Sequence, residues 1–139
     1  MREDPIREGL LYAGTENGMF VSLDDGKSWQ PLRLNLPAVP ITDIRARKDG
    51  LVVATQGRAF WILDDVFVVR QAGDDLEKNS LTVFKAPVMV QGRSSGSGGA
   101  AAAANPSPDV PIYYHLNNVA GKNAGLNITI RDAEGRRCL

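Results

Sequence analysis

The sequence contains very little cysteine and no excess of charge. Its single cysteine, Cys138, leaves no possibility of a disulfide within the 139 residues. Sixteen basic residues balance sixteen acidic residues, so composition gives no electrostatic reason to expect binding to nucleic acid or to an anionic membrane. No apolar run approaches the roughly 18 residues that a transmembrane helix needs. We therefore expect neither a membrane span nor a nucleic-acid partner.

Histidine, which often carries catalysis or binds metals, is also scarce. His115 is the only histidine, and it lies in a tyrosine-rich stretch with no serine, cysteine or carboxylate motif around it. A packing or surface role is therefore predicted for His115, and we predict no metal site and no cofactor. Residues 1–5 are mostly charged and no apolar segment follows them, so the sequence shows no secretory signal.

One stretch carries a strong local signal. Residues 22–29, Ser-Leu-Asp-Asp-Gly-Lys-Ser-Trp, lie between two apolar runs that are typical of strands. The Asp-Gly step supplies the positive φ of a tight turn, and the Asp24 carboxylate can fold back onto nearby backbone N–H groups. The tryptophan then covers the turn. We predict a structural turn built by Ser22, Asp24, Gly26, Ser28 and Trp29.

The chain also contains an internal repeat with an offset of forty residues. Residues 11–25 align without a gap on residues 51–65 and are identical at six positions. A period of roughly 40–45 residues built from short strands is typical of four-stranded propeller blades. The second copy has Ile62, Val66 and Val69 in place of the serine, glycine and tryptophan. We expect it to keep its strands and to lose the turn.

Alternating and continuous apolar runs predict an all-β fold. Asn17-Gly18 is a strong hairpin signal, and the prolines between residues 36 and 40 interrupt the pairing. Three strands are predicted before Pro40 and four after it, which amount to most of one blade and all of another. The predicted strands are 10–15, 19–23, 29–34, 41–47, 51–55, 59–63 and 81–84.

The last third of the chain has a different composition. Residues 92–108 are rich in glycine, serine and alanine, which predicts a flexible linker without stable structure. After it, residues 110–116 and 126–131 alternate as strands, and residues 132–135 read as a hairpin turn. We expect the opening strands of an Ig-like or fibronectin-like sandwich that the chain does not complete. The predicted domains are propeller blades (1–91), a linker (92–108) and a truncated sandwich (109–139).

These features resemble a known family. Residues 22–29 match the Asp-box, Ser/Thr-x-Asp-x-Gly-x-Thr-Trp, of sialidase-type BNR-repeat propellers, except that Ser28 replaces the threonine. Residues 57–65, Gly-Arg-Ala-Phe-Trp-Ile-Leu-Asp-Asp, are similar to a run in the C-terminal blades of large bacterial BNR-repeat proteins, often labelled glycosyl hydrolase or sortilin-like. The resemblance implies a fragment of a larger propeller, with the remaining blades as partners and a secreted, periplasmic or cell-surface location.

The resemblance leaves the function open between two classes. Glycoside hydrolysis usually needs two carboxylates about 5 to 9.5 Å apart, and the adjacent aspartates at 24–25 and 64–65 would point to opposite faces of a strand. No catalytic set is therefore predicted in this chain, and whether the full-length protein is an enzyme stays open. The first expectation is a scaffold that binds a glycan or a peptide. The alternative is the non-catalytic part of a secreted glycoside hydrolase whose carboxylates lie upstream.

A binding site, if the chain contains one, is expected on the turns opposite the Asp-box. Ligands of propellers commonly use the face that carries the turns between second and third strands. The polar residues predicted on this face are Glu16, Asn17, Gln56 and Arg58, with Thr42 and Asp43 near the inner strand.

Overall fold

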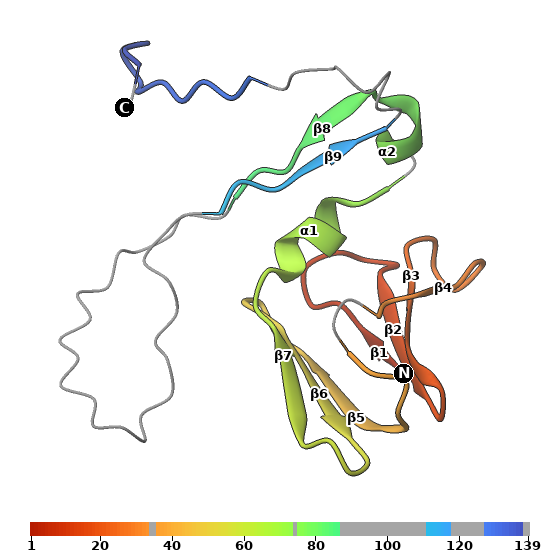
Figure 1. The fold of residues 1–139 in the computed structure, drawn as a ribbon. Coiled ribbons are helices and arrows are strands. Elements are labelled where there is room, and N and C mark those ends of the chain that lie inside the picture. Colours follow the sequence, from red (N-terminus) through yellow and green to blue (C-terminus); the bar gives the residue numbers. More distant parts are fainter. Residues whose placement is uncertain (34–35, 74, 87–110, 118–126, 138–139) are drawn as a thin grey trace, which may run out of the picture.

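The computed structural model describes residues 1–33, 36–73, 75–86, 111–117 and 127–137. This part of the chain is mostly β, with three antiparallel sheets and two short helices (Figure 1). The all-β class predicted from the sequence is therefore confirmed. Within the described residues, no helix is long and apolar enough to cross a membrane.

The first sheet is a four-stranded antiparallel meander in the order β1-β2-β3-β4. The two-residue turn 16–17 joins its central strands, since Thr15 pairs with Gly18, and Gly18 takes a φ of 119°. The hairpin predicted at Asn17-Gly18 is thus confirmed. The first strand was missed, and the strand predicted over 29–34 has only two residues. The strands are β1 (Arg2–Glu3), β2 (Leu11–Thr15), β3 (Gly18–Ser22) and β4 (Gln30–Pro31).

The second sheet has three strands in the order β5-β6-β7, where four were predicted. The chain leaves β7 into helix α1 (Val66–Gln71), and a second short helix, α2 (Asp75–Lys78), follows. Residues 81–84 were assigned to this sheet, which is wrong, because β8 (Leu81–Val83) pairs with β9 (Tyr114–Leu116) instead. The strands of the second sheet are β5 (Ile41–Ala46), β6 (Leu51–Thr55) and β7 (Phe60–Leu63).

The two hairpins of the repeat differ in register by one residue. Leu11 pairs with Ser22 in the first, whereas Leu51 pairs with Leu63 in the second. The cause is the turn after β6, which has three residues (56–58) instead of two and includes Gly57 with a φ of 80°. A one-residue shift exchanges the two faces of a strand. The gapless forty-residue alignment therefore cannot match both strands of the second hairpin to those of the first.

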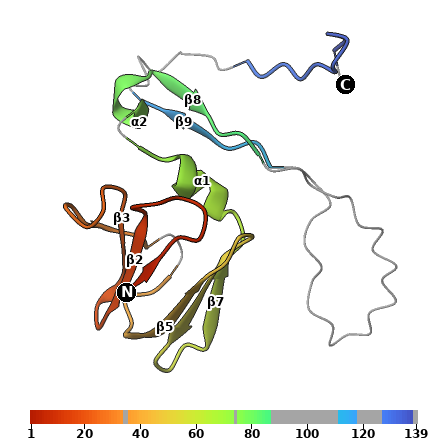
Figure 2. The same ribbon diagram turned by 180° about the vertical axis from the view of Figure 1, so that it is seen from behind.

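The hydrophobic core lies between the first two sheets and α1 (Figure 2). The sheets approach closely where Gly14 on β2 faces Ile41 on β5, since a Cβ at Gly14 would lie 2.5 Å from Ile41 Cγ2. Trp61 packs on this core, whereas Phe60 and Ile62, on the other face of β7, are 75% and 64% exposed. The core side chains are Leu10, Tyr12, Met19, Val21, Ile44, Leu51, Val53 and Val66.

The C-terminal part differs from the predicted sandwich strands. Tyr114–Leu116 forms β9 against β8, and the segment 127–130 has no strand pairing among the described residues. The turn at 132–135 is confirmed by the bridge between Arg131 and Arg137 and by the hydrogen bond from the Arg136 N–H to the Asp132 carboxylate (2.7 Å). The predicted linker, 92–108, and Cys138 lie outside the described residues.

The close approach of β2 and β5 predicts that Gly14→Ala is destabilising. The added methyl group overlaps Ile41, and overpacking of this kind costs about 1–3 kcal/mol of unfolding free energy. Urea unfolding monitored by tryptophan fluorescence measures it. Gly73→Ala is the control, because its added Cβ meets only Arg7 Nη2 at 3.9 Å. Equal stability of the two variants would contradict the packing described.

Candidate functional site

The Asp-box residues form one closed set of hydrogen bonds between β3 and β4. The buried Ser22 hydroxyl accepts from the Gly26 N–H and donates to Asp24 Oδ1, both at 2.8 Å. Ser28 donates to Asp24 twice, through its backbone N–H (2.9 Å) and its hydroxyl (2.6 Å). The Trp29 indole N–H donates to the Gly26 carbonyl at 3.2 Å. All five residues singled out in the sequence therefore take part in this one turn.

Hydrogen bonds within the turn occupy the Asp24 carboxylate. The hydrogen bond from the Ser28 hydroxyl, followed by those from the Ser28 N–H and from Ser22, lowers the pKa of Asp24 to about 2. A carboxylate held ionised by three donors is a poor proton donor at neutral pH. Asp25 takes the positive φ of 58°, and its N–H donates to the Gly9 carbonyl (2.9 Å). The geometry is that of a structural element, not of a general acid.

A second polar centre, which no local sequence pattern indicates, lies beneath α1. Both Asp4 oxygens accept from Arg70 Nε, at 2.9 and 3.0 Å, and the two side chains are 0% and 10% exposed. Asp4 also accepts from the backbone N–H groups of Ile6 and Arg7 and from the Tyr12 hydroxyl (3.0 Å). Burial alone raises the pKa of Asp4, but these hydrogen bonds outweigh burial and lower the pKa below its usual 3.8.

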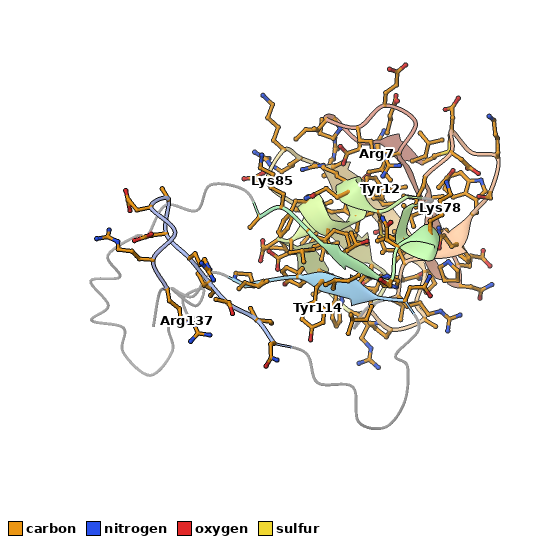
Figure 3. The ribbon with its side chains drawn as sticks, turned by 90° about the horizontal axis from the view of Figure 1, so that it is seen from above. Arg7, Tyr12, Lys78, Lys85, Tyr114 and Arg137 are labelled. Atoms are coloured by element: carbon orange, nitrogen blue, oxygen red, sulfur yellow. The ribbon has the colours of Figure 1, made fainter. Side chains whose placement is uncertain are left out.

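The side chains of Arg7 and Arg70 connect three segments of the chain through hydrogen bonds to backbone carbonyls. Arg70 donates to the carbonyls of Arg47 and Lys48 in the turn between β5 and β6, at 2.6 and 2.5 Å. Arg7 donates to the Arg70 carbonyl (2.9 Å) and to the Ala72 carbonyl at the C-terminal end of α1. Figure 3 labels Arg7 and Tyr12 in a view from above. Because both Asp4 oxygens and all three side-chain nitrogens of Arg70 are engaged in hydrogen bonds within the fold, we interpret this centre as structural.

The polar turns predicted to bind a ligand lie at one end of the two sheets, opposite the Asp-box (Figures 1 and 2). The side chains of Glu16, Asn17, Gln56 and Arg58 are all exposed. The Gln56 N–H donates to the Pro40 carbonyl (2.9 Å), just before β5. The structure thus brings both turns to the expected end, where no hydrogen bond links one turn to the other among the described residues. A ligand-binding role for these four residues stays a prediction.

A polar pocket of about 220 Å³ opens at the same end. Arg2 on β1 donates to Asp43 Oδ1 (3.3 Å) and to the Ile44 carbonyl (3.1 Å), and Arg45 donates to Asp43 Oδ2 (3.0 Å). The hydrogen bond from the Ile44 N–H, together with the two arginines, lowers the pKa of Asp43. The sequence had indicated Thr42 and Asp43 and had missed Arg2. The lining residues are Met1, Arg2, Gly14, Ile41, Thr42, Asp43 and Ile44.

The pocket offers donors and acceptors but lacks a catalytic pair. Its lining contains one carboxylate, Asp43, which lies between two guanidinium groups. Among the residues that the structure describes, no group of three or more histidine, cysteine, aspartate or glutamate side chains could hold a metal ion. The arrangement can hold a polar group through Arg2, Thr42 and Asp43.

Comparison with known proteins adds no further assignment. No protein-family model, no curated protein sequence and no solved structure matches this chain. The function is therefore argued from the Asp-box turn, the stacked sheets and the polar pocket.

The lowered pKa of Asp24 predicts an acid-dependent contribution to stability. The folded-state pKa of about 2 lies below the usual 3.8, so this contribution is present above pH 3.8 and is lost as the pH falls towards 2. Asp24→Asn should lower the urea midpoint at pH 7 and flatten its decline between these pH values. The control is Asp49→Asn, whose side chain is 87% exposed. Parallel pH profiles of wild type and Asp24→Asn would contradict the prediction.

The buried ion pair predicts a large effect of removing one partner. Arg70→Met leaves the Asp4 carboxylate buried without its counter-ion, which costs about 3–5 kcal/mol of unfolding free energy. Arg45→Met is the matched control, because this side chain is 70% exposed and surface pairs contribute about 0–1 kcal/mol. Urea unfolding at pH 7 measures both. A loss for Arg70→Met no larger than that for Arg45→Met would show that the pair does not stabilise the fold.

Proposed function

We propose that this chain is part of an Asp-box β-propeller and that it acts as a scaffold which binds a glycan or a peptide. The observation that carries the proposal is the placement of the polar pocket and both polar turns at the end of the sheets opposite the Asp-box. One end of the sheets is thereby occupied by structural hydrogen bonds, and the other end presents polar groups to solvent.

The blade-like arrangement supports the propeller part of the proposal. Two antiparallel meanders stack face to face, with β5 packed against β1 and β2, as successive blades of a propeller do. The Asp-box closes the hairpin between the third and fourth strands of the first sheet. The partners of this chain would then be the remaining blades of a longer chain. Its location would be secreted, periplasmic or cell-surface, as the family resemblance implies.

The chemistry of the pocket supports binding more than hydrolysis. A sugar hydroxyl both donates and accepts hydrogen bonds, and so does a peptide unit through its N–H and C=O. Adjacent guanidinium and carboxylate groups, here Arg2 and Asp43, can serve both roles at once. A glycoside hydrolase would need a second carboxylate across the sugar, and Asp43 is the only one in this lining. The alternative role, as the non-catalytic part of such an enzyme, rests on the resemblance alone.

The proposal predicts that substitutions weaken ligand binding only when they lie at the polar end of the sheets. The chain would be screened against glycan and peptide arrays, and hits would be titrated by calorimetry. Asp43→Ala and Arg58→Ala should each weaken binding by about tenfold or more, which corresponds to about 1.4 kcal/mol. Asp49→Ala is the matched control, because it lies in the turn at the opposite end of β5.

Two outcomes would contradict the proposal. An equal loss of affinity in Asp49→Ala would show that the polar end is not the binding surface, and the absence of any hit on both arrays would argue against a binding scaffold. Release of sugar from a glycan hit, abolished by Asp43→Ala, would replace the proposal by an enzymatic function.

A further inference from the structure

The outer edge of β7 is unpaired within the described part of the chain. The Thr55 N–H donates to the Ala59 carbonyl (3.1 Å), and bonded pairs alternate with non-bonded pairs along an antiparallel ladder. Phe60 and Ile62, which face Ala54 and Val52, therefore occupy non-bonded pairs. Their N–H and C=O groups point away from β6, and no hydrogen bond joins them to another described residue. Two donors and two acceptors are thus available along this edge.

The side chains on this edge are apolar and exposed. Phe60 is 75% and Ile62 is 64% exposed, whereas protein strand edges are usually protected by charge, by proline or by a covering segment. In the first sheet the corresponding strand, β3, is covered by β4, where Phe20 pairs with Pro31. Among the described residues the second sheet has no such strand, because the chain passes from β7 into α1. The edge of β7 can therefore pair with one more strand.

A strand-like segment without a sheet partner lies elsewhere in the described chain. Residues 127–130, Asn-Ile-Thr-Ile, alternate polar and apolar side chains, and Ile128 and Ile130 are 56% and 51% exposed. The described residues that follow pair among themselves, through the bridge between Arg131 and Arg137 and the hydrogen bond from the Asp132 N–H to the Arg136 carbonyl. Figures 1 and 2 show this segment, in dark blue, well away from β7, and Figure 3 labels Arg137 at its end, apart from the sheets.

We infer that residues 127–131 of a second copy of this chain add to the edge of β7 as its fourth strand. In an antiparallel register that places Ile130 beside Phe60 and Ile128 beside Ile62, the outward backbone groups of β7 are all paired. Side chains directly opposite one another share a face, so both isoleucines extend the apolar rows that start on β6.

A second copy is the partner that the geometry favours. The edge and the segment lie apart within one chain (Figure 1), and each copy carries one of each. Two copies can therefore exchange segments reciprocally, which closes a dimer with two-fold symmetry. The exchange places four exposed apolar side chains per contact side by side and so reduces their contact with water, and burial of apolar surface is the main favourable term in association.

The first test is self-association of the full chain, measured by sedimentation over a wide range of concentrations. The weight-average mass of the wild type should rise from the monomer towards the dimer. Ile62→Lys places a charge on the edge and should remain a monomer at the same concentrations. The matched control is Val83→Lys on β8, an apolar strand residue of similar exposure, 61%, which should associate as the wild type does. Circular dichroism melts would show that both variants fold.

The second test is complementation. Ile62→Lys blocks the edge and leaves the segment intact, whereas Ile130→Lys blocks the segment and leaves the edge intact. Each variant alone should be monomeric, and an equimolar mixture should form a one-to-one complex. A synthetic peptide of residues 127–132 should also dissociate the wild-type dimer, while a peptide with the same residues in scrambled order should not. This peptide experiment remains decisive if a variant fails to fold.

Three results would overturn the inference. They are a wild type that stays monomeric at all concentrations, a loss of association in Val83→Lys equal to that in Ile62→Lys, and a mixture of the two complementary variants that stays monomeric. A peptide that leaves the dimer intact would show that another surface holds the copies together.

Discussion

The buried carboxylate of Asp4 is the constraint on which the rest of this structure depends. An ionised group removed from water is costly unless counter-charge and hydrogen bonds replace its hydration, and Asp4 obtains both from Arg70, Tyr12 and two backbone N–H groups. These partners belong to three parts of the chain: the loop after β1, strand β2 and helix α1. Satisfying one carboxylate therefore fixes the loop after β1, the position of α1 and, through the carbonyls that Arg70 reaches, the turn between β5 and β6.

The position of α1 decides how the second repeat differs from the first. In the first repeat the chain leaves β3 through the Asp-box and returns as β4, so the edge of β3 is covered. In the second repeat Val66 enters the core and α1 is held by Arg7 and Arg70, so the chain does not return along β7. Two copies of a similar hairpin consequently have different edges, one closed and one open. The polar end of the sheets is unaffected, because both polar turns lie at the opposite end of the sheets from α1 (Figure 1).

Local signals accounted for most of the strands, and long-range contacts accounted for the errors. The hairpin at Asn17-Gly18 and the turn around Asp24 were predictable because glycine and aspartate impose their geometry within four or five residues. The placement of residues 81–84 in the second sheet was wrong, since a β-prone run does not specify its partner. The pocket itself was not predicted. Strand order placed Thr42 and Asp43 on the polar face, whereas Arg2 reaches Asp43 across 41 residues and had no such signal.

The sequence by itself determined the all-β class, the turn of residues 22–29 with its hydrogen bonds, and the positions of the polar turns, because each depends on backbone preferences and on neighbours close in the chain. Only the tertiary structure decided the register of β7, the helix in place of a fourth strand, and the pairing of Asp4 with Arg70. These features depend on which groups meet after the sheets have stacked. Two properties of the assembled core decide them: the cost of an unpaired buried charge and the close packing of side chains. Neither can be predicted from the spacing of residues along the chain.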